Sequence, residues 1–221
     1  EGLKKRFPGS TIHFIGSKHG LESKILPTQQ NGFTLLPVRG FLRGFNVKSS
    51  LRNILFPTRF ILSYFKSKKI LKKIDPSVVI GTGGYASGLP LIAAITNGIP
   101  TLIHEQNSFP GITTKWLSSR VDRVCISYED SRRHLRNKGG VVTGNPVRKE
   151  IIGRNKLQSL QKFGLTNNKP TISILGGSQG SKILNESIDN IIKHLSEFQI
   201  IWQTGNIHFD QYNHYSKENI K

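Results

Sequence analysis

Short apolar runs alternate along the chain with longer stretches in which apolar residues recur at helical spacing. The apolar runs predict strands at residues 11–16, 33–38, 77–80, 100–104, 123–127, 141–143, 171–175 and 199–202. The helical spacing predicts helices at residues 58–74, 86–97, 110–119, 156–163 and 182–195. Short, nearly continuous apolar strands separated by helices are typical of a parallel α/β sheet.

The texture of the sequence changes near residue 146, where a polar, lysine-rich stretch typical of an interdomain connection begins. We therefore expect a Rossmann-like domain at residues 1–145, a connection at 146–170 and the start of a second domain at 171–221. About fifty residues are too few for a doubly wound domain, which takes five or six strands. Because the chain also begins with Glu1 rather than Met, we expect a fragment.

The composition narrows the class of protein. Of the 221 residues, 36% are hydrophobic, enough to build a core. Cys125 is the single cysteine, which excludes an intramolecular disulfide framework and a multi-cysteine zinc site. No run approaches the roughly 18 uninterrupted apolar residues of a membrane-spanning helix.

The formal net charge is +19, and the basic residues are unevenly placed. Residues 23–74 contain no acidic residue, and the predicted helix at 58–74 mixes large apolar residues with lysines. That combination is typical of a helix lying at an anionic membrane surface. The candidate membrane contacts are Leu55, Phe56, Phe60, Lys66 and Lys69.

Three other interpretations of this basic helix stay open. In the first, the apolar face of the helix packs in the core. In the second, one edge of the helix packs on the sheet while residues near Phe56 stay exposed. The third is nucleic-acid binding. No zinc knuckle, RNP-like strand or helix-turn-helix pattern accompanies the charge, so we expect no nucleic-acid partner.

The segment Gly81-Thr82-Gly83-Gly84-Tyr85 stands where a predicted strand ends and a predicted helix begins. Glycines there let the backbone approach a ligand, and free amides at a helix start favour an anion such as phosphate. The spacing is neither G-x-G-x-x-G nor a P-loop, so a tight turn without a ligand is the alternative.

A second polar segment, His104-Glu105-Gln106-Asn107, follows the predicted strand at 100–104. Ligands of open α/β sheets bind at the carboxyl ends of strands, so this segment is a candidate site. It is not H-E-x-x-H, and zinc is therefore not expected. The alternative is that one or two of these side chains cap the following helix.

A third candidate is the glycine-rich segment at 176–181, whose consecutive amides can cradle a diphosphate. Ser181 is alternatively a plain helix cap. Between the two glycine-rich segments, Arg148 follows Gly144-Asn145-Pro146. An arginine at a hinge suits a phosphate-bearing ligand, and an ordinary surface arginine is the alternative.

Together, GTGGYASG, HEQNSFPGITTKWLS, TGNPVR and GGSQGSKILNE resemble the MurG family, in the same order and over nearly all of the chain. The resemblance implies an α/β fold of the GT-B glycosyltransferase type, with two Rossmann-like doubly wound domains, the second truncated. It implies transfer of N-acetylglucosamine from UDP-GlcNAc to undecaprenyl-diphosphate-MurNAc-pentapeptide (lipid I), giving lipid II for peptidoglycan. It also implies a peripheral protein on the cytoplasmic face of the bacterial plasma membrane.

The resemblance assigns roles to individual residues. The N-terminal domain is expected to face the acceptor and the membrane, with Gly83, Gly84 and Tyr85 near the acceptor diphosphate. His104 and Glu105 match a cleft-facing pair and are the candidate catalytic residues. The residues expected near UDP-GlcNAc are Asn107, Arg148, Ser178 and Gln179.

The implied chemistry is an inverting displacement in which the MurNAc 4-hydroxyl attacks the anomeric carbon, assisted by a base. Backbone amides and a helix dipole can offset charge on the leaving diphosphate, so no cofactor or protein-bound metal is expected. Family members also carry a G-G-T-G-G-H loop that would precede Glu1, and they continue past residue 221. The chain alone is therefore expected to be inactive.

Two competing functions stay open. One is another UDP-sugar enzyme of the same architecture, such as a UDP-GlcNAc 2-epimerase or a diacylglycerol glycosyltransferase. The other is a basic module that binds nucleic acid or a membrane surface without catalysis.

Overall fold

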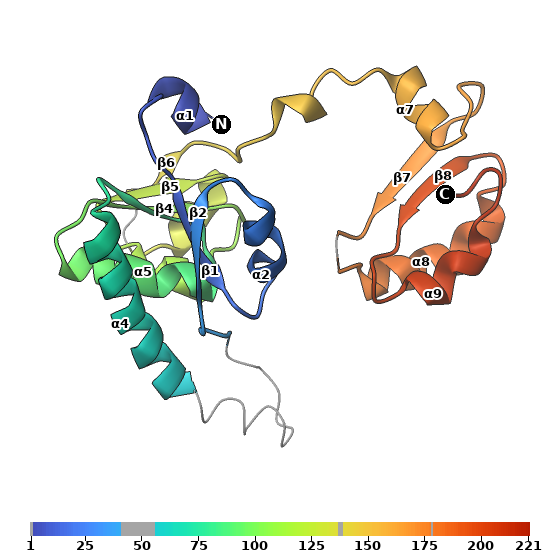
Figure 1. The fold of residues 1–221 in the computed structure, drawn as a ribbon. Helices are drawn as coiled ribbons and strands as arrows, with labels where there is room; N and C mark the ends of the chain where they lie inside the picture. The colour runs from blue at the N-terminus through green and yellow to red at the C-terminus, as the bar shows by residue number, and fades with distance from the viewer. Residues whose placement is uncertain (1, 41–55, 137–138, 178) are drawn as a thin grey trace. The chain divides into compact units, whose positions relative to one another are not determined.

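The computed structural model describes residues 2–40, 56–136, 139–177 and 179–221 (Figure 1). Leu55 and Ser178, two of the predicted site residues, lie outside the described residues. The chain divides into two compact units, Glu1–Pro146 and Val147–Lys221. Each unit is described by itself.

The first unit contains two parallel sheets. Strand β1 (His13–Ser17) pairs with β2 (Gly32–Leu36), with His13 opposite Gly32 and Ser17 opposite Leu36. The second sheet has the order β3-β4-β5-β6. Its strands are β3 (Val79–Gly81), β4 (Thr101–Glu105), β5 (Arg123–Ile126) and β6 (Val141–Val142). Because all of these pairs are parallel, the carboxyl ends of neighbouring strands lie at one edge.

Helix α5 (Gly84–Thr96) connects the two sheets, since it contacts both β1 and β3. It lies beneath the strands in Figure 1, with α4 (Phe56–Ile74) packed against it. Leu89 of α5 packs with Leu36 and Val38, and Leu91 packs with Ile103 and Leu117. Shorter helices complete the unit: α1 (Gly2–Arg6), α2 (Glu22–Ile25), α6 (Ile112–Leu117) and 3₁₀ turns at Leu26–Thr28 and Glu129–His134.

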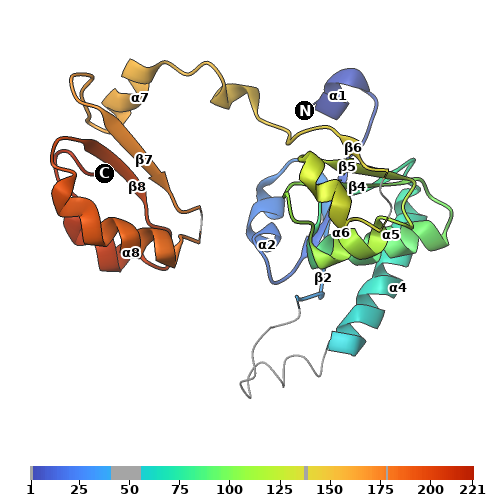
Figure 2. The same ribbon diagram turned by 180° about the vertical axis from the view of Figure 1, so that it is seen from behind.

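The second unit is built on β7 (Thr171–Leu175) and β8 (Gln199–Gln203), a parallel pair (Figure 2). Its helices are α7 (Lys156–Lys162), α8 (Lys182–Ile191), α9 (Phe209–Tyr212) and 3₁₀ turns at Lys149–Ile151, Ile192–His194 and Asn213–Tyr215. Its core gathers Ile174, Ile192, Ile200, Trp202 and Tyr212. The free edge of β8 pairs with residues 219–221, where Trp202 N donates to Lys221 O at 2.7 Å.

The predicted α/β class with parallel sheets is confirmed, and each predicted strand and helix is present within about two residues of its expected ends, except the helix predicted at 182–195. Two helices differ at their ends. The helix predicted from residue 110 begins at Ile112 because Gly111 is its N-cap, so Pro110 precedes the helix. The helix predicted through residue 195 ends four residues earlier, at Ile191, and a 3₁₀ turn at Ile192–His194 follows it.

Candidate functional site

The turn at residues 104–107 lies at the carboxyl edge of the four-stranded sheet. In the register of β4 and β5, His104 pairs with Cys125 and Glu105 with Ile126. The segments that follow β5 and β6 therefore reach the same edge. Ser127 Oγ lies 2.9 Å from Glu105 O and 2.6 Å from Asn145 Oδ1, while Asn145 Nδ2 donates to Gln106 O at 3.2 Å. Three strand ends are thus joined into one polar surface.

The buried carboxylate of Glu105 accepts hydrogen bonds from several residues of this turn. Its side chain is only 2% exposed. Oε1 accepts from the main-chain and side-chain amides of Asn107 at 3.1 and 2.9 Å, and Oε2 accepts from Gly111 N at 3.2 Å. Because Gly111 is the N-cap of α6, this carboxylate links the end of β4 to the start of that helix.

The environment of Glu105 keeps the carboxylate ionised. Burial raises the pKa, but hydrogen bonding by Thr114, Asn107 and Gly111 outweighs it and leaves the pKa below its ordinary 4.5. The buried Thr114 hydroxyl forms no hydrogen bond of standard geometry with the described residues, yet its position beside the carboxylate lowers the pKa. Glu105 is therefore a weak base whose lone pairs are already engaged.

His104 is also fixed by its neighbours. Its Nε2 lies 3.0 Å from Gly144 O, and since a carbonyl only accepts, Nε2 carries the proton. The Gln106 side-chain amide donates to Nδ1 at 3.2 Å. These two bonds occupy both ring nitrogens of His104.

Asn107 is the exposed member of the turn. Its Nδ2 is committed to Glu105, and its main-chain carbonyl accepts from Ser131 Oγ at 2.7 Å. The residues that the structure describes supply no hydrogen bond to Asn107 Oδ1. Glu105 therefore fixes the orientation of the Asn107 side chain, whose Oδ1 is left as an acceptor facing solvent.

The glycine-rich turn before α5 lies beside this surface. Gly83 and Gly84 have φ values of 82° and 72°, a region that L side chains rarely adopt, so the turn requires glycine. A Cβ on Gly83 would lie 3.5 Å from Gln106 Oε1, so the two predicted segments lie close to each other. Tyr85, in the first turn of α5, is 39% exposed.

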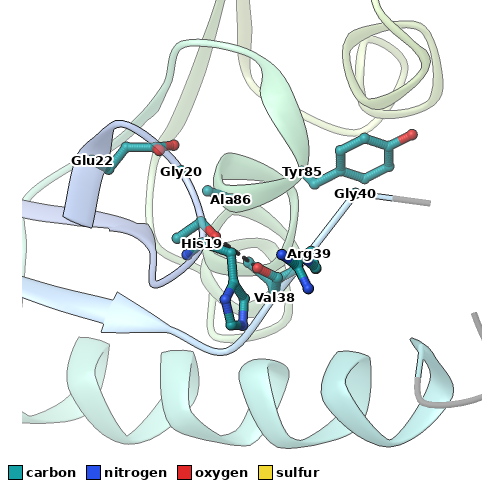
Figure 3. Close-up of a pocket in the computed structure, with 9 residues that line it drawn as sticks. His19, Gly20, Glu22, Val38, Arg39, Gly40, Tyr85 and Ala86 are labelled. Atoms are coloured by element: carbon teal, nitrogen blue, oxygen red, sulfur yellow. Dashed lines mark hydrogen bonds between the residues drawn. The ribbon is translucent and has the colours of Figure 1, made fainter. Parts of the chain in front are cut away.

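Tyr85 also borders a pocket of about 180 Å³ in the first unit (Figure 3). The pocket is lined by residues that follow β1 and β2 and by the first turn of α5. These are Ser17, His19, Gly20, Glu22, Val38, Arg39, Gly40, Tyr85 and Ala86. The sequence motifs pointed to Tyr85 but did not single out the other residues of this pocket.

The glycine-rich segment of the second unit packs tightly against the turn after β8. Gly180 has φ 77°, and a Cβ there would meet Thr204 O at 2.0 Å. Gly176 N donates to Gln203 O at 3.2 Å. Ser181 accepts from Leu184 N and is the N-cap of α8, so the helix-cap interpretation of Ser181 is confirmed. Gln179 is exposed on this loop.

Asn185 lies within the segment GGSQGSKILNE, but the sequence alone assigned no role to it. It is fully buried in α8, donates to Thr204 O at 2.9 Å and accepts from Trp202 Nε1 at 3.1 Å. The signal in the sequence was that Asn185 is a polar residue one turn inside an amphipathic helix. Asn185 fixes the turn that Gly180 packs against.

Arg148 lies in the second unit and is exposed. Among the described residues, no group of three or more His, Cys, Asp or Glu side chains is placed to hold a metal ion.

Helix α4 exposes several of its large apolar side chains, although Leu71 is buried. Ser63 and Ser67 are fully buried, whereas Ile61, Leu62 and Phe65 are 54, 62 and 62% exposed. Phe60 is 40% exposed, and Lys69 is exposed. Lys66 differs from its prediction as a membrane contact: its ammonium group turns inward and donates to Leu35 O at 2.9 Å. Phe56 is half-buried, with its ring centroid 6.0 Å from that of Phe60.

The sequence of residues 1–126 matches the model of the glycosyltransferase family 28 N-terminal domain. The chain belongs to glycosyltransferase family 28. The matched range contains both predicted segments of the first unit, at residues 83–85 and 104–107.

A protein from Ruminiclostridium cellulolyticum is similar in sequence to this chain. It is named UDP-N-acetylglucosamine--N-acetylmuramyl-(pentapeptide) pyrophosphoryl-undecaprenol N-acetylglucosamine transferase, and it is 41% identical over 213 residues. The match covers 94% of this family 28 chain and 57% of the relative. The chain thus spans less than two thirds of the length of the curated relatives that it matches.

Solved structures share the fold of this family 28 chain. Acinetobacter baumannii MurG has a TM-score of 0.63 at 24% identity, over 100% of this chain and 58% of that one. A putative UDP-N-acetylglucosamine 2-epimerase from Listeria monocytogenes has a TM-score of 0.62 at 12% identity, over 99% and 62%. Since the two scores are nearly equal, the fold alone does not separate transferase from epimerase.

Proposed function

We propose that this chain is part of a transferase that moves N-acetylglucosamine from UDP-GlcNAc onto lipid I, giving lipid II in peptidoglycan synthesis. The observation that carries the proposal is 41% identity over 213 residues to a relative named for that transfer. The polar surface at the carboxyl edge of a parallel sheet supports it, because ligands of such folds bind there.

In the proposed reaction the MurNAc 4-hydroxyl attacks the anomeric carbon of the donor sugar. The bond from that carbon to the diphosphate oxygen breaks, UDP leaves with the electron pair, and the hydroxyl proton passes to a base. Asn107 contacts the donor sugar or the reaction centre through its exposed Oδ1, because Glu105 fixes its Nδ2. Held in one orientation, this acceptor adds selectivity for a sugar hydroxyl or amide.

We assign Glu105 and His104 positioning roles rather than the role of the base. Glu105 is buried, with a lowered pKa and three donors on its oxygens. Both ring nitrogens of His104 are engaged. A general base needs a free lone pair, and the hydrogen bonds of the two side chains already engage these lone pairs.

For the second unit, we propose that the loop at residues 176–181 and Arg148 bind UDP-GlcNAc. Backbone amides at the start of α8 favour the diphosphate, and Gln179 is exposed on that loop. Ser178 is included on the resemblance alone. The division of roles between an acceptor-binding first domain and a donor-binding second one is part of the same proposal.

We also propose that α4 attaches the protein to an anionic membrane on its cytoplasmic face. No helix among the described residues is long and apolar enough to cross a membrane. Ile61, Leu62 and Phe65 are more than half exposed on one side of α4, with Lys69 along the same helix. Apolar side chains beside lysines suit the boundary between headgroups and acyl chains better than nucleic acid, which would leave them in water.

A chimaera tests the transferase proposal. This chain replaces the matching 57% of the Ruminiclostridium cellulolyticum relative, and incorporation of labelled N-acetylglucosamine into a lipid I analogue is measured. We expect turnover, and we expect Asn107→Ala to reduce kcat/KM by about a hundredfold, the scale of one lost contact to the reacting group. Circular dichroism and the melting temperature show whether each variant is folded.

Three outcomes count against the proposal. A folded chimaera that leaves lipid I unmodified contradicts it, as does transfer to diacylglycerol in preference to lipid I. Conversion of UDP-GlcNAc to its 2-epimer would favour the epimerase alternative instead.

A further inference from the structure

The loop that joins β4 to α6 exposes a large aromatic side chain close to Asn107. Phe109 is 64% exposed. It comes two residues after Asn107, so the Cα atoms of the two residues are at most about 7 Å apart. Helix α6, which the loop enters, lies beside α5 (Figure 2). An aromatic ring close to a single fixed hydrogen-bond acceptor is a combination typical of ligand sites.

Side chains from two other segments hold the ring of Phe109. Lys115, in α6, places its Nζ over the ring at 3.6 Å from the centroid. The ring of His134 packs against it at an interplanar angle of 61°, with the centroids 4.7 Å apart. Lys115 reaches Phe109 because helical side chains point back toward the start of their helix. The ring is therefore oriented before any ligand binds, which lowers the entropic cost of binding.

The backbone on both sides of Phe109 is also anchored. On one side, Ser131 Oγ donates to Asn107 O at 2.7 Å. On the other side, Pro110 is fully buried and Gly111 N donates to the Glu105 carboxylate at 3.2 Å. The exposure of Phe109 is therefore a property of a well-anchored loop, and the cost of exposing this ring calls for a ligand that covers it.

Lys115 lacks a carboxylate partner among the described residues. The arginines near it differ in this respect, since Arg132 pairs with Glu129 and Arg133 with Asp130. The contact with an aromatic face leaves the N–H groups of the Lys115 ammonium able to donate to an anion. Lys115 is half-buried, so solvent screens such a bond less than at a fully exposed lysine.

The proposed acceptor brings a suitable anion to this place. An N-acetylmuramyl group carries its peptide on the ring oxygen next to the 4-hydroxyl, which is the hydroxyl that attacks in the proposed reaction. When that hydroxyl reacts beside Asn107, the peptide begins close to Phe109. A peptide attached through its amino end keeps a free carboxylate at its other end, so the acceptor offers both a chain to cover the ring and a charge for Lys115.

We propose that Phe109 and Lys115 bind the peptide of the acceptor. The ring of Phe109 packs against the peptide, and the ammonium group of Lys115 donates to a peptide carboxylate. This assignment names the part of the acceptor that the loop recognises, and it rests on the proposed function. A sugar alone would use the ring but not the cation, which makes the charge of the ligand the deciding variable.

NMR titration of the 221-residue chain with N-acetylmuramyl-pentapeptide, which has neither lipid nor diphosphate, tests the site directly. The probe is the imidazole signal of His134, identified by its loss in His134→Gln, because a ligand on Phe109 alters the ring environment of His134. We expect a saturable shift at constant ionic strength. The same ligand with its carboxylates converted to amides should bind about tenfold more weakly.

Three variants separate the cation from the ring, with affinities measured from the ligand's own signals. Lys115→Gln should bind the carboxylate and amide ligands equally, because its side chain is neutral. Phe109→Ala should weaken both ligands by about fivefold and keep the preference for the carboxylate. Lys24→Gln removes the same charge from an exposed position in α2 and is the matched control, which should behave like the wild type. The amide spectrum of each variant shows whether it is folded.

Equal affinity of the wild type for the carboxylate and amide ligands would overturn the proposal. Loss of the preference in Lys24→Gln would also overturn it, since the preference would then reflect net charge alone. N-acetylmuramic acid methylamide lacks the peptide, and binding of this compound as tight as that of the full ligand would assign Phe109 to the sugar instead.

The chimaera described above distinguishes this proposal from the transferase proposal. Lys115→Gln in the chimaera should raise KM for the lipid I analogue by about tenfold, with a smaller change in kcat. Carboxylate-dependent peptide binding without turnover in the chimaera would refute the transferase proposal and leave the site. Turnover with an unchanged KM in Lys115→Gln would refute the peptide site and leave the transferase proposal.

Discussion

Asn107 donates both its main-chain and its side-chain amide to the same oxygen of Glu105, at 3.1 and 2.9 Å. The exposed residue of the turn is therefore oriented by a residue that is 2% exposed. Any change at Glu105 should act on Asn107 without a direct contact between Glu105 and the ligand.

Glu105→Gln should destabilise the first unit. Glutamine offers one acceptor oxygen and an amide that faces the Gly111 N–H, so at least one buried donor loses its partner. We expect the free energy of opening of β4 and β5 to fall by about 1–3 kcal/mol, measured by amide hydrogen exchange. Glu129→Gln, at an exposed pair with Arg132, is the matched control and should leave that exchange unchanged. Equal exchange in wild type and Glu105→Gln would contradict the role assigned to Glu105.

The contribution of Glu105 should depend on pH in a defined direction. Its pKa in the folded protein is below the ordinary 4.5, so the carboxylate stabilises the fold above that pH. The contribution is lost as the pH falls through the lowered pKa. The stability difference between wild type and Glu105→Gln should therefore be constant near neutral pH and shrink in acid. Asp122, whose pKa is also lowered, is present in both proteins and cancels in the difference. A difference that grows in acid would contradict this sign.

Leu62→Ser and Phe65→Ser should weaken binding to anionic vesicles. Both side chains are 62% exposed, so the changes remove apolar surface without opening the core. Burying such a side chain is worth about 1.5–3 kcal/mol, which predicts at least a tenfold loss of partitioning in a cosedimentation assay. Phe163→Ser, at a phenylalanine that is 45% exposed in the second unit, is the control and should bind like the wild type. Unchanged binding of Phe65→Ser would refute the membrane assignment of α4.

Gly180→Ala and Gly177→Ala should separate backbone strain from steric exclusion. The two glycines have similar φ values of 77° and 75°, but a Cβ at Gly180 would meet Thr204 O, whereas the space around Gly177 is open. We expect about 1–2 kcal/mol of destabilisation from the strained conformation in Gly177→Ala, and more in Gly180→Ala. Amide exchange of β7 and β8 measures both. Equal effects would mean that the loop at 176–181 moves freely away from the turn after β8.

Much of the fold follows from local patterns. The apolar run at residues 100–104 predicted β4 because a buried parallel strand has to be apolar along nearly its whole length. The same pattern placed His104–Asn107 and the loop at 176–181 at strand ends: His104 and Glu105 are the last two residues of β4, and the loop at 176–181 follows β7. The pocket lined by His19 and Arg39 was not predictable, because those residues follow different strands and carry no motif.

The sequence by itself determined the order of strands and helices, the polar segments at strand ends and the amphipathic character of residues 58–74. Only the tertiary structure decided which side of that helix faces outward and what each polar side chain contacts. Periodicity identifies an apolar stripe but not the surface that covers it, and here the small Ser63 and Ser67 allow the close packing that leaves Leu62 and Phe65 exposed. Likewise, only folding brings the Gly111 amide and the Thr114 hydroxyl to the Glu105 carboxylate, several residues away in the chain, and the positioning role that we propose for Glu105 rests on these contacts.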